Sequence, residues 1–334
     1  MRRLLLLVSA TVLMFTQVKG QYIPQSGQPF QYAPIYNPAF TGIENFMDVK
    51  LGHRYQWAAF KDNAPQFSNL AISFRTKQPL DLKTNALRPS RTDFTRVVPK
   101  SRLGFHGLGF NVYNEKVGPL GEYGVGLHYA VHFPLSGKVT LSGGVGAMYE
   151  NSRLRGGDEF YWGEQVDTND PIYKTLQAGD ISQSSLWTRV GFLIYGETFY
   201  VGGTYYPWNS TLGDPEFAFN DQFYSGSLQV GFSFPVNDDF DLKPGILALW
   251  QIDNTFVIDY QAKVYLQDKA WFGLTYRDIK AGVVSGGFNF NPTLSASYSY
   301  EFSLGKLRTF SGSTHELVLS ARLRNFKQLI QRTW

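Results

Sequence analysis

The sequence is a succession of short segments in which apolar and polar residues alternate. The clearest segment is Tyr123–Phe133, whose odd positions are apolar or aromatic and whose even positions are glycine, alanine or histidine. Successive side chains of a strand point to opposite faces of a sheet, so this segment predicts a strand with one apolar face and one small or polar face. About fourteen such segments lie between residues 46 and 325. An even number of alternating strands predicts an all-β fold, a transmembrane antiparallel β-barrel whose apolar face contacts lipid.

The connections between these segments predict the orientation of the barrel. If the first strand runs outward, the long connections Asn151–Gln183 and Pro207–Gln222 lie outside, and most short connections lie in the periplasm, as in bacterial barrels. The exception is the long basic connection Thr76–Ser101, which falls on the periplasmic side. The predicted strands are 47–56, 69–75, 103–113, 123–133, 139–149, 186–195, 198–206, 228–234, 242–250, 255–266, 271–277, 283–290, 294–302 and 315–325.

The composition agrees with a barrel and not with a bundle of membrane helices. Aromatic residues make up 16% of the chain and charged residues only 17%, against about 25% charged residues in typical soluble domains. The mean hydropathy is nevertheless −0.22, as expected where each strand is apolar on one face only. The sequence contains no cysteine, which excludes disulfides, thiolate metal sites and a catalytic thiol.

The first twenty residues have the parts of a secretory signal peptide. A positively charged start is followed by the apolar stretch Leu4–Phe15, and the predicted cleavage site lies between Gly20 and Gln21. The alternative is a single membrane anchor, but the apolar stretch is shorter than the roughly 20 residues that a spanning helix needs. We therefore expect export to the cell outer membrane.

The expected domain organisation follows from these boundaries. Residues 1–20 are the signal peptide, 21–45 an irregular N-terminal segment, 46–325 the barrel and 326–334 a periplasmic tail. The irregular segment is rich in Gln, Pro, Tyr and Asn, and two positions remain open for it, inside the lumen or at the periplasmic mouth. Cleavage of the signal lowers the net charge from +4 to +1, so the apparent basicity does not indicate nucleic-acid binding.

The candidate chemistry in the predicted barrel is sparse. His128 and His132 share the inward face, but four residues of strand separate them by about 13 Å, too far for a single metal ion. No G-x-S-x-G elbow occurs, and the glycine run Gly143–Gly146 lies inside a strand and opens no helix. Such glycines more often mark bends or crowded lumen positions. We expect no catalytic site, no cofactor and no metal centre.

The long outer connection is acidic, and calcium binding to its carboxylates stays open beside a simple solvated loop. The acidic residues are Asp158, Glu159, Glu164, Asp167, Asp170 and Asp180.

The predicted lumen carries interleaved charges of both signs. A porin more often shows a constriction or a field of one sign, whereas paired charges are typical of a closed or plugged barrel. The lumen-facing charged residues are Asp48, Lys50, Arg54, Arg75, Arg189, Asp259, Lys263, Glu301, Arg322 and Arg324.

Several short motifs resemble those of the PorP/SprF family. Tyr36–Gly42 resembles the family's Asn-Pro-Ala-Tyr-Ala-Gly start, and Arg54–Trp57 resembles its Arg-x-Gln-Trp motif at the end of the first strand. Ala64-Pro65 resembles the turn that follows this motif in the family. Gly107–Gly118 is similar to its glycine-bounded hairpin, and 299–304 and 313–317 to its C-terminal motifs. The residues at family-motif positions are Asn37, Pro38, Gly42, Arg54, Gln56, Trp57, His315 and Glu316.

This resemblance implies an outer-membrane component of the type IX secretion system that accompanies the export or surface attachment of adhesins, including those of gliding motility. It implies as partners the translocon, the adhesin substrate and a periplasmic peptidoglycan-associated protein. The sidedness of the connections places the expected periplasmic contacts at Lys83, Arg88, Arg91, Arg96 and Lys100. The main alternative is an outer-membrane channel for small solutes. A more distant alternative, a lipid-modifying enzyme, requires a Ser–His pair near the outer rim.

Overall fold

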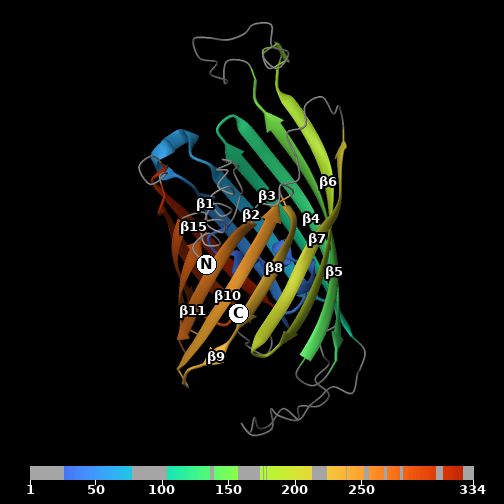
Figure 1. Cartoon of the computed structure of the whole chain (residues 1–334), viewed down its shortest axis with the longest axis vertical. Helices are drawn as coiled ribbons and strands as arrows, with labels where there is room; N and C mark the ends of the chain where they lie inside the picture. Colours follow the sequence, from blue (N-terminus) through green and yellow to red (C-terminus); the bar gives the residue numbers. More distant parts are fainter. Residues whose placement is uncertain are drawn as a thin grey trace, which may run out of the picture.

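The computed structural model describes residues 26–76, 104–135, 139–156, 174–175, 177, 179–212, 224–237, 239–251, 256–266, 269–278, 281–305 and 311–325. These residues form an antiparallel barrel (Figure 1). Its strands are β1 (Met47–Tyr55), β2 (Gln66–Arg75), β3 (Phe105–Val117), β4 (Leu120–Pro134), β5 (Val139–Leu154), β6 (Ile181–Gly196), β7 (Phe199–Leu212), β8 (Tyr224–Phe232), β9 (Phe234–Pro235), β10 (Phe240–Gln251), β11 (Phe256–Leu266), β12 (Ala270–Arg277), β13 (Ala281–Asn289), β14 (Leu294–Ser303) and β15 (Ser313–Leu323).

Pairing of the first and last strands closes the sheet. β1 pairs with β15 from Met47↔Leu323 to Tyr55↔His315, and β1 also pairs with β2. The two-residue β9 pairs only with β10 and continues β8 after a one-residue break. The wall of the barrel therefore consists of fourteen strands. The predicted barrel of about fourteen strands is confirmed.

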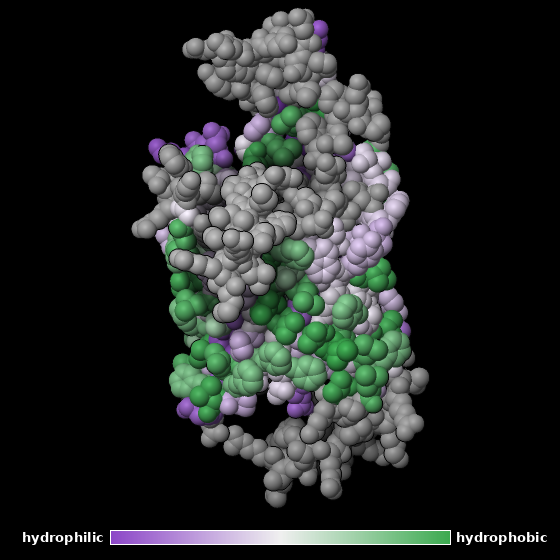
Figure 2. All heavy atoms as spheres, in the orientation of Figure 1, coloured by the Kyte–Doolittle hydropathy of each residue, from purple (hydrophilic) through white to green (hydrophobic). Residues whose placement is uncertain are grey.

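Alternation along each strand separates an outer from an inner face. On β4, Leu127 is 61% exposed on the outer face, whereas its neighbour His128 is 4% exposed in the lumen. Figure 2 shows apolar residues gathered in a belt around the lower part of the wall, with paler and purple residues above it. This belt is the surface that contacts lipid. None of the helices among the described residues is long and apolar enough to span a bilayer.

The wall has unequal height. β5 and β6 each have 16 residues, whereas β12 has 8 and β13 has 9, and β5 and β6 rise above the β1 side at the top of Figure 1. This end carries the connections 155–180 and 213–223, which follow β5 and β7. Long connections of bacterial barrels face the outside, so we call it the outer end and the opposite one the periplasmic end.

The tall strands correct two predicted boundaries. The predicted outer connection Asn151–Gln183 is shorter than expected, because β5 continues to Leu154 and β6 begins at Ile181. The predicted connection from Pro207 is also wrong, since β7 continues to Leu212. Proline is tolerated there because the register between β6 and β7 shifts at this point, and a bulge accommodates a residue without an N–H.

Candidate functional site

Residues 26–46 run through the interior of the barrel, and we call them the plug. None of them is exposed, and Gln28, Asn37 and Thr41 are almost completely inaccessible. The sequence left two positions open for this segment, and the structure places it in the lumen. The plug contains the short helices η1 (Pro29–Tyr32), α2 (Ala33–Tyr36) and η2 (Pro38–Phe40). Each has a proline in its first turn, where the missing N–H costs nothing.

The plug extends from the periplasmic end of the lumen into its outer third. At its start, the Ser26 hydroxyl donates to Glu316 (2.6 Å) on the outer part of β15. Near its end, Arg75, the last residue of β2, donates to the carbonyls of Gly42 (3.2 Å) and Ile43 (2.8 Å) at the periplasmic end. The chain therefore enters the lumen from β1 at the periplasmic end and reaches the outer third at Ser26.

The wall holds the plug by its main chain. Peptide carbonyls buried away from water need hydrogen-bond donors, and eight carbonyls of the plug receive them from side chains on seven different strands. The donors, each with the residue whose carbonyl accepts, are Arg277 (Ser26), Lys50 (Gln31), Arg189 (Ile35), Ser227 (Tyr36), Ser142 (Ala39), His132 (Thr41) and Arg75 (Gly42 and Ile43).

Glycines in the wall let the plug backbone approach closely. An ideal Cβ at Gly144 would overlap the main chain of Pro38 and Ala39, and one at Gly107 would overlap the carbonyl of Thr41. The adjacent Gly143 faces the other way and a Cβ there meets nothing within 4 Å. The glycine run in this strand therefore marks a crowded lumen position, one of the two roles expected for it.

At the Asn37-Pro38 turn, the wall also binds side chains of the plug. The Asn37 amide donates to the carbonyls of Phe192 (3.1 Å) and Gly203 (3.3 Å), and its oxygen accepts from the Ala39 N–H (2.9 Å). The following aromatic residue, Phe40, is 3% exposed. It packs with Leu193 and Tyr195 of β6 and, edge to face at 5.4 Å, with Tyr200 of β7. This turn is the apolar anchor of the plug.

A buried ionic network holds the free end of the plug. Arg277 binds Asp259 in bidentate fashion (2.8 and 3.0 Å) and Glu301 (3.0 Å), and Arg54 also binds Glu301 (3.1 Å). Glu316, 3.7 Å from Arg54, accepts from the main-chain N–H of Gly27 (2.6 Å). Paired charges are what the interleaved signs predict, and a desolvated charge needs such partners.

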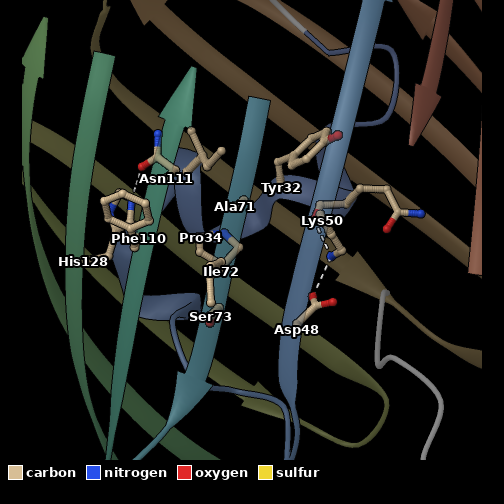
Figure 3. A pocket seen from close by; sticks show the side chains of 12 residues that line it. Tyr32, Pro34, Asp48, Lys50, Ala71, Ile72, Ser73, Phe110, Asn111 and His128 are labelled. Carbon is tan, nitrogen blue, oxygen red and sulfur yellow. Dashed lines mark hydrogen bonds and ion pairs between the residues drawn. The ribbon is translucent and has the colours of Figure 1, made fainter. Parts of the chain in front are cut away.

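Figure 3 shows the side of the plug that faces β1 to β4, where Tyr32 and Pro34 lie against polar wall residues. The Lys50 ammonium lies 2.8 Å from Asp48, and His128 Nε2 lies 2.6 Å from the Asn111 side-chain oxygen. The cavity between them measures about 20 Å³, enough for about one water molecule. Burial raises the pKa of the Tyr32 phenol well above its usual value, so it stays neutral.

A second contact of the plug is aromatic and cationic. The Lys263 ammonium of β11 lies 3.7 Å from the centre of the Phe30 ring, and Phe30 meets Trp271 of β12 edge to face at 5.1 Å. Trp271 stacks in turn on Tyr265 at 6.1 Å. A cation over an aromatic face is attracted to it, so the lumen wall of β11 and β12 attracts this part of the plug.

Comparison with known families decides which family this plugged barrel represents. The family model described as "Type IX secretion system membrane protein PorP/SprF" matches residues 18–321. The chain belongs to the PorP/SprF family. It is accordingly an outer-membrane β-barrel of type IX secretion, as the sequence motifs predict.

Several outer-membrane proteins of known structure are similar to this chain. The chain is similar to the CymD monoaromatic hydrocarbon channel, with 12% identity, a TM-score of 0.48 and coverage of 90% of this chain and 93% of that one. The Pseudomonas putida toluene transporter TodX is 10% identical, with a TM-score of 0.46 and coverage of 86% of this chain and 91% of that one. Acinetobacter baumannii Omp33 is 8% identical, with a TM-score of 0.45 and coverage of 85% of this chain and 100% of that one. No functionally curated protein matches the sequence.

The structure places five of the PorP/SprF motif residues in the plug or beside it. Asn37, Pro38 and Gly42 belong to the plug, where Gly42 adopts φ +74° against the main chain of Gly107. Arg54 and Glu316 belong to the ionic network that holds the plug's free end. Arg54 and Glu316 lie far apart in the sequence and become cross-strand partners where β1 pairs with β15.

Three further motif residues lie at the outer rim. The Gln56 side chain accepts from Arg54 (3.3 Å), and the Trp57 N–H donates to the Thr314 hydroxyl (3.2 Å). Trp57 has a left-handed backbone (φ 53°) and begins η3 (Ala58–Asn63) as its N-cap. His315 points outward instead, where its Nδ1 is bonded to the Tyr298 hydroxyl (2.6 Å).

His315 also forms the Ser–His pair that the lipid-enzyme alternative requires. Its Nε2 lies 2.9 Å from the Ser313 hydroxyl oxygen at the outer rim. The partner of Nδ1 is the neutral phenol of Tyr298, not the carboxylate or amide that orients the base of a hydrolytic triad. Among the described residues, no group of three His, Cys, Asp or Glu could hold a metal ion. Among the described residues, the two ring nitrogens of His315 are thus bonded to the hydroxyls of Ser313 and Tyr298.

Several sequence predictions fall outside the described residues. The predicted cleavage site at Gly20 and Gln21 is one, and the periplasmic contacts Lys83, Arg88, Arg91, Arg96 and Lys100 are another. Of the acidic outer connection, only Asp180 is described. It forms an ion pair with Arg153 and accepts from the Gly156 N–H, and this backbone bond, followed by Arg153, holds the pKa of its carboxyl below the usual value.

The lumen contacts also contain residues that sequence analysis missed. Arg277, Ser142 and Ser227 bind the plug. The predicted strands include Arg277 and Ser142, but the nearest one begins one residue after Ser227. Conversely, Arg324 was predicted to face the lumen but is exposed after the end of β15. It adopts a left-handed backbone (φ 58°), which takes it out of the strand alternation. The other predicted lumen charges lie inside the barrel.

Proposed function

We propose that this PorP/SprF barrel is a non-enzymatic component of the type IX secretion system. It assists the secretion or cell-surface attachment of adhesin substrates of the gliding-motility type. The observation that carries the proposal is the filled lumen, because eight plug carbonyls are bonded to the wall. As long as the plug occupies the interior, the two rims are the contact surfaces for partners.

The charges of the connections support different partners at the two rims. The periplasmic connection Thr76–Ser101 carries a clear excess of basic residues, and the outer connection 155–180 an excess of acidic ones. Opposite charges steer different partners to different surfaces. We assign the outer rim to the translocon and the adhesin, and the periplasmic rim to a peptidoglycan-associated protein. A solute channel is less well supported, since it needs an open lumen.

Deletion of the gene followed by surface proteomics tests the proposal. We expect at least a tenfold loss of one adhesin, or of a small group of them, from the cell surface, with other type IX substrates unchanged. Complementation with the full-length gene restores the adhesin. An unchanged surface proteome contradicts the proposal, and a general loss of secretion shows instead a core role in the translocon.

Charge reversal tests the periplasmic assignment. The triple variant Arg88→Glu, Arg91→Glu and Arg96→Glu changes the local charge by six units, so an acidic partner surface that was attracted is now repelled. We expect at least a tenfold loss of the periplasmic proteins that co-purify with the native barrel, measured by quantitative mass spectrometry.

The matched control makes the same change of charge on the other side of the membrane. It is the outer-side triple variant Lys61→Glu, Arg155→Glu and Lys174→Glu. We expect it to keep the periplasmic partners. If both triple variants keep the same partners, the assignment of the basic connection to partner binding is wrong.

A further inference from the structure

The lumen wall recognises features that any polypeptide chain carries. Its donors bind main-chain carbonyls at intervals along the whole plug, from Ser26 to Ile43. Gly107 and Gly144 make room for a backbone, not for a particular side chain. A site for a small solute needs a few convergent polar groups, whereas donors distributed along the full length of a channel fit an extended or irregular peptide.

One turn of the plug is recognised through both a polar and an apolar side chain. The Asn37 amide binds two wall carbonyls, and Phe40 fills the apolar pocket of β6 and β7. Ala39 is 0% exposed and packs in the same apolar cluster, so a small side chain is favoured there. The wall therefore prefers a turn of the type Asn-Pro-small-aromatic, and it adds weaker side-chain contacts at Ser26 and Phe30.

Within the described residues, the plug is continuous with the wall at one end. Its last residue, Phe46, directly precedes β1, whereas Ser26 lies at the outer end and is the first residue that the structure describes. The plug can therefore leave the lumen without breaking a strand pair of the wall. The contacts of its outer half are mainly polar or charged, and water can replace them. The buried side-chain amide of Gln28 has no hydrogen-bond partner among the described residues, so this half of the plug is not optimally bound.

We propose that the lumen is a polypeptide-binding site, occupied in the resting state by the plug and open to exchange with a segment of the exported protein. The exchanging segment is a flexible peptide that contains an Asn-Pro-small-aromatic turn. The identity of the partner as an exported protein rests on the proposed function. The binding site itself rests on the wall contacts and can be tested without secretion.

A disulfide lock on the full-length protein tests the exchange. An ideal Cβ at Gly27 lies 2.7 Å from the Ser299 hydroxyl oxygen, so Gly27→Cys with Ser299→Cys brings two sulfurs within bonding range. The chain has no other cysteine. The probe is a fluorescent synthetic peptide of residues 26–46, added to the variant in lipid nanodiscs. The reduced protein should bind it, and the oxidised protein at least tenfold more weakly. Equal binding in the two states, or no binding to the reduced protein at 1 mM peptide, overturns the proposal.

A second measurement does not depend on the lock. Gln28 is 0% exposed, so Gln28→Cys should react with a maleimide slowly, and at least tenfold faster when the peptide displaces the plug. A control peptide with Asn37→Leu and Phe40→Ser lacks the recognised turn and should not accelerate the reaction. Acceleration by both peptides, or by neither, overturns the proposal.

The two proposals fail in different experiments. If gene deletion leaves the surface proteome intact but the peptide exchanges, the secretion role is wrong and the binding site remains. If deletion removes an adhesin but the peptide neither binds in place of the plug nor accelerates the maleimide reaction, the proposed binding site is refuted and the secretion role remains.

Discussion

A barrel carrying Gly144→Val is expected to conduct ions steadily in a planar lipid bilayer, whereas the native barrel is expected to be silent. A side chain at position 144 overlaps the main chain of Pro38 and Ala39. Such overpacking costs about 1–3 kcal/mol, and each of the displaced hydrogen bonds of Asn37 and Ala39 contributes about 1 kcal/mol. A total of about 4 kcal/mol raises the population of the unplugged state about a thousandfold.

The control for this variant is the neighbouring residue. Gly143→Val adds the same side chain to the same strand, but on the face where a Cβ meets nothing within 4 Å. It should fold and remain silent. A silent Gly144→Val barrel that is folded by heat-modifiable gel mobility contradicts the role of this glycine in seating the plug. Steady conductance of the native barrel contradicts the closed lumen and supports the channel alternative.

Replacement of Arg277 by methionine is expected to lower the free energy of unfolding by about 3–5 kcal/mol. The substitution leaves Asp259, which is 0% exposed, without the guanidinium that binds both of its oxygens, and removes one of the two arginines on Glu301. It also removes the donor to the Ser26 carbonyl. Urea unfolding in lipid vesicles, followed by tryptophan fluorescence, measures the change.

Two further variants test whether the lower free energy of unfolding arises from the buried position of Arg277 or from the loss of any arginine. Arg153→Met removes an ion pair with Asp180 whose arginine side chain is 61% exposed, and exposed pairs contribute at most about 1 kcal/mol. Asp259→Asn combined with Arg277→Met removes the uncompensated charge and should recover part of the loss. If Arg277→Met and Arg153→Met have equal effects, the network does not stabilise the barrel as proposed.

The strands were the most predictable part of this protein. Lipid outside and a polar lumen inside force an alternation that the sequence shows directly, as in Tyr123–Phe133. Where the wall rises above the lipid, both faces meet polar surroundings and the alternation disappears. For that reason the outer ends of β5 and β6, around Asn151 and Gln183, were assigned to a connection.

The closed lumen was only partly predictable. The interleaved lumen charges indicated pairing, but the partners of Arg277 come from the adjacent β11, from β14 and from the plug. Only the folded barrel brings β14 and the plug to Arg277. The family motifs identified Asn37 and Gly42 but not what they touch. Phe192 and Gly203, which accept from Asn37, do so through their carbonyls, so their side chains give no sign of the contact.

The sequence by itself therefore determined the barrel, its approximate strand number, the two faces of each strand and the family. All of these depend on side-chain character that repeats every second residue. The tertiary structure alone decided that residues 26–46 fill the lumen and that Ser26 lies at the outer end. The plug has no such periodicity, and the wall binds it through peptide carbonyls, which every residue carries and no sequence pattern distinguishes.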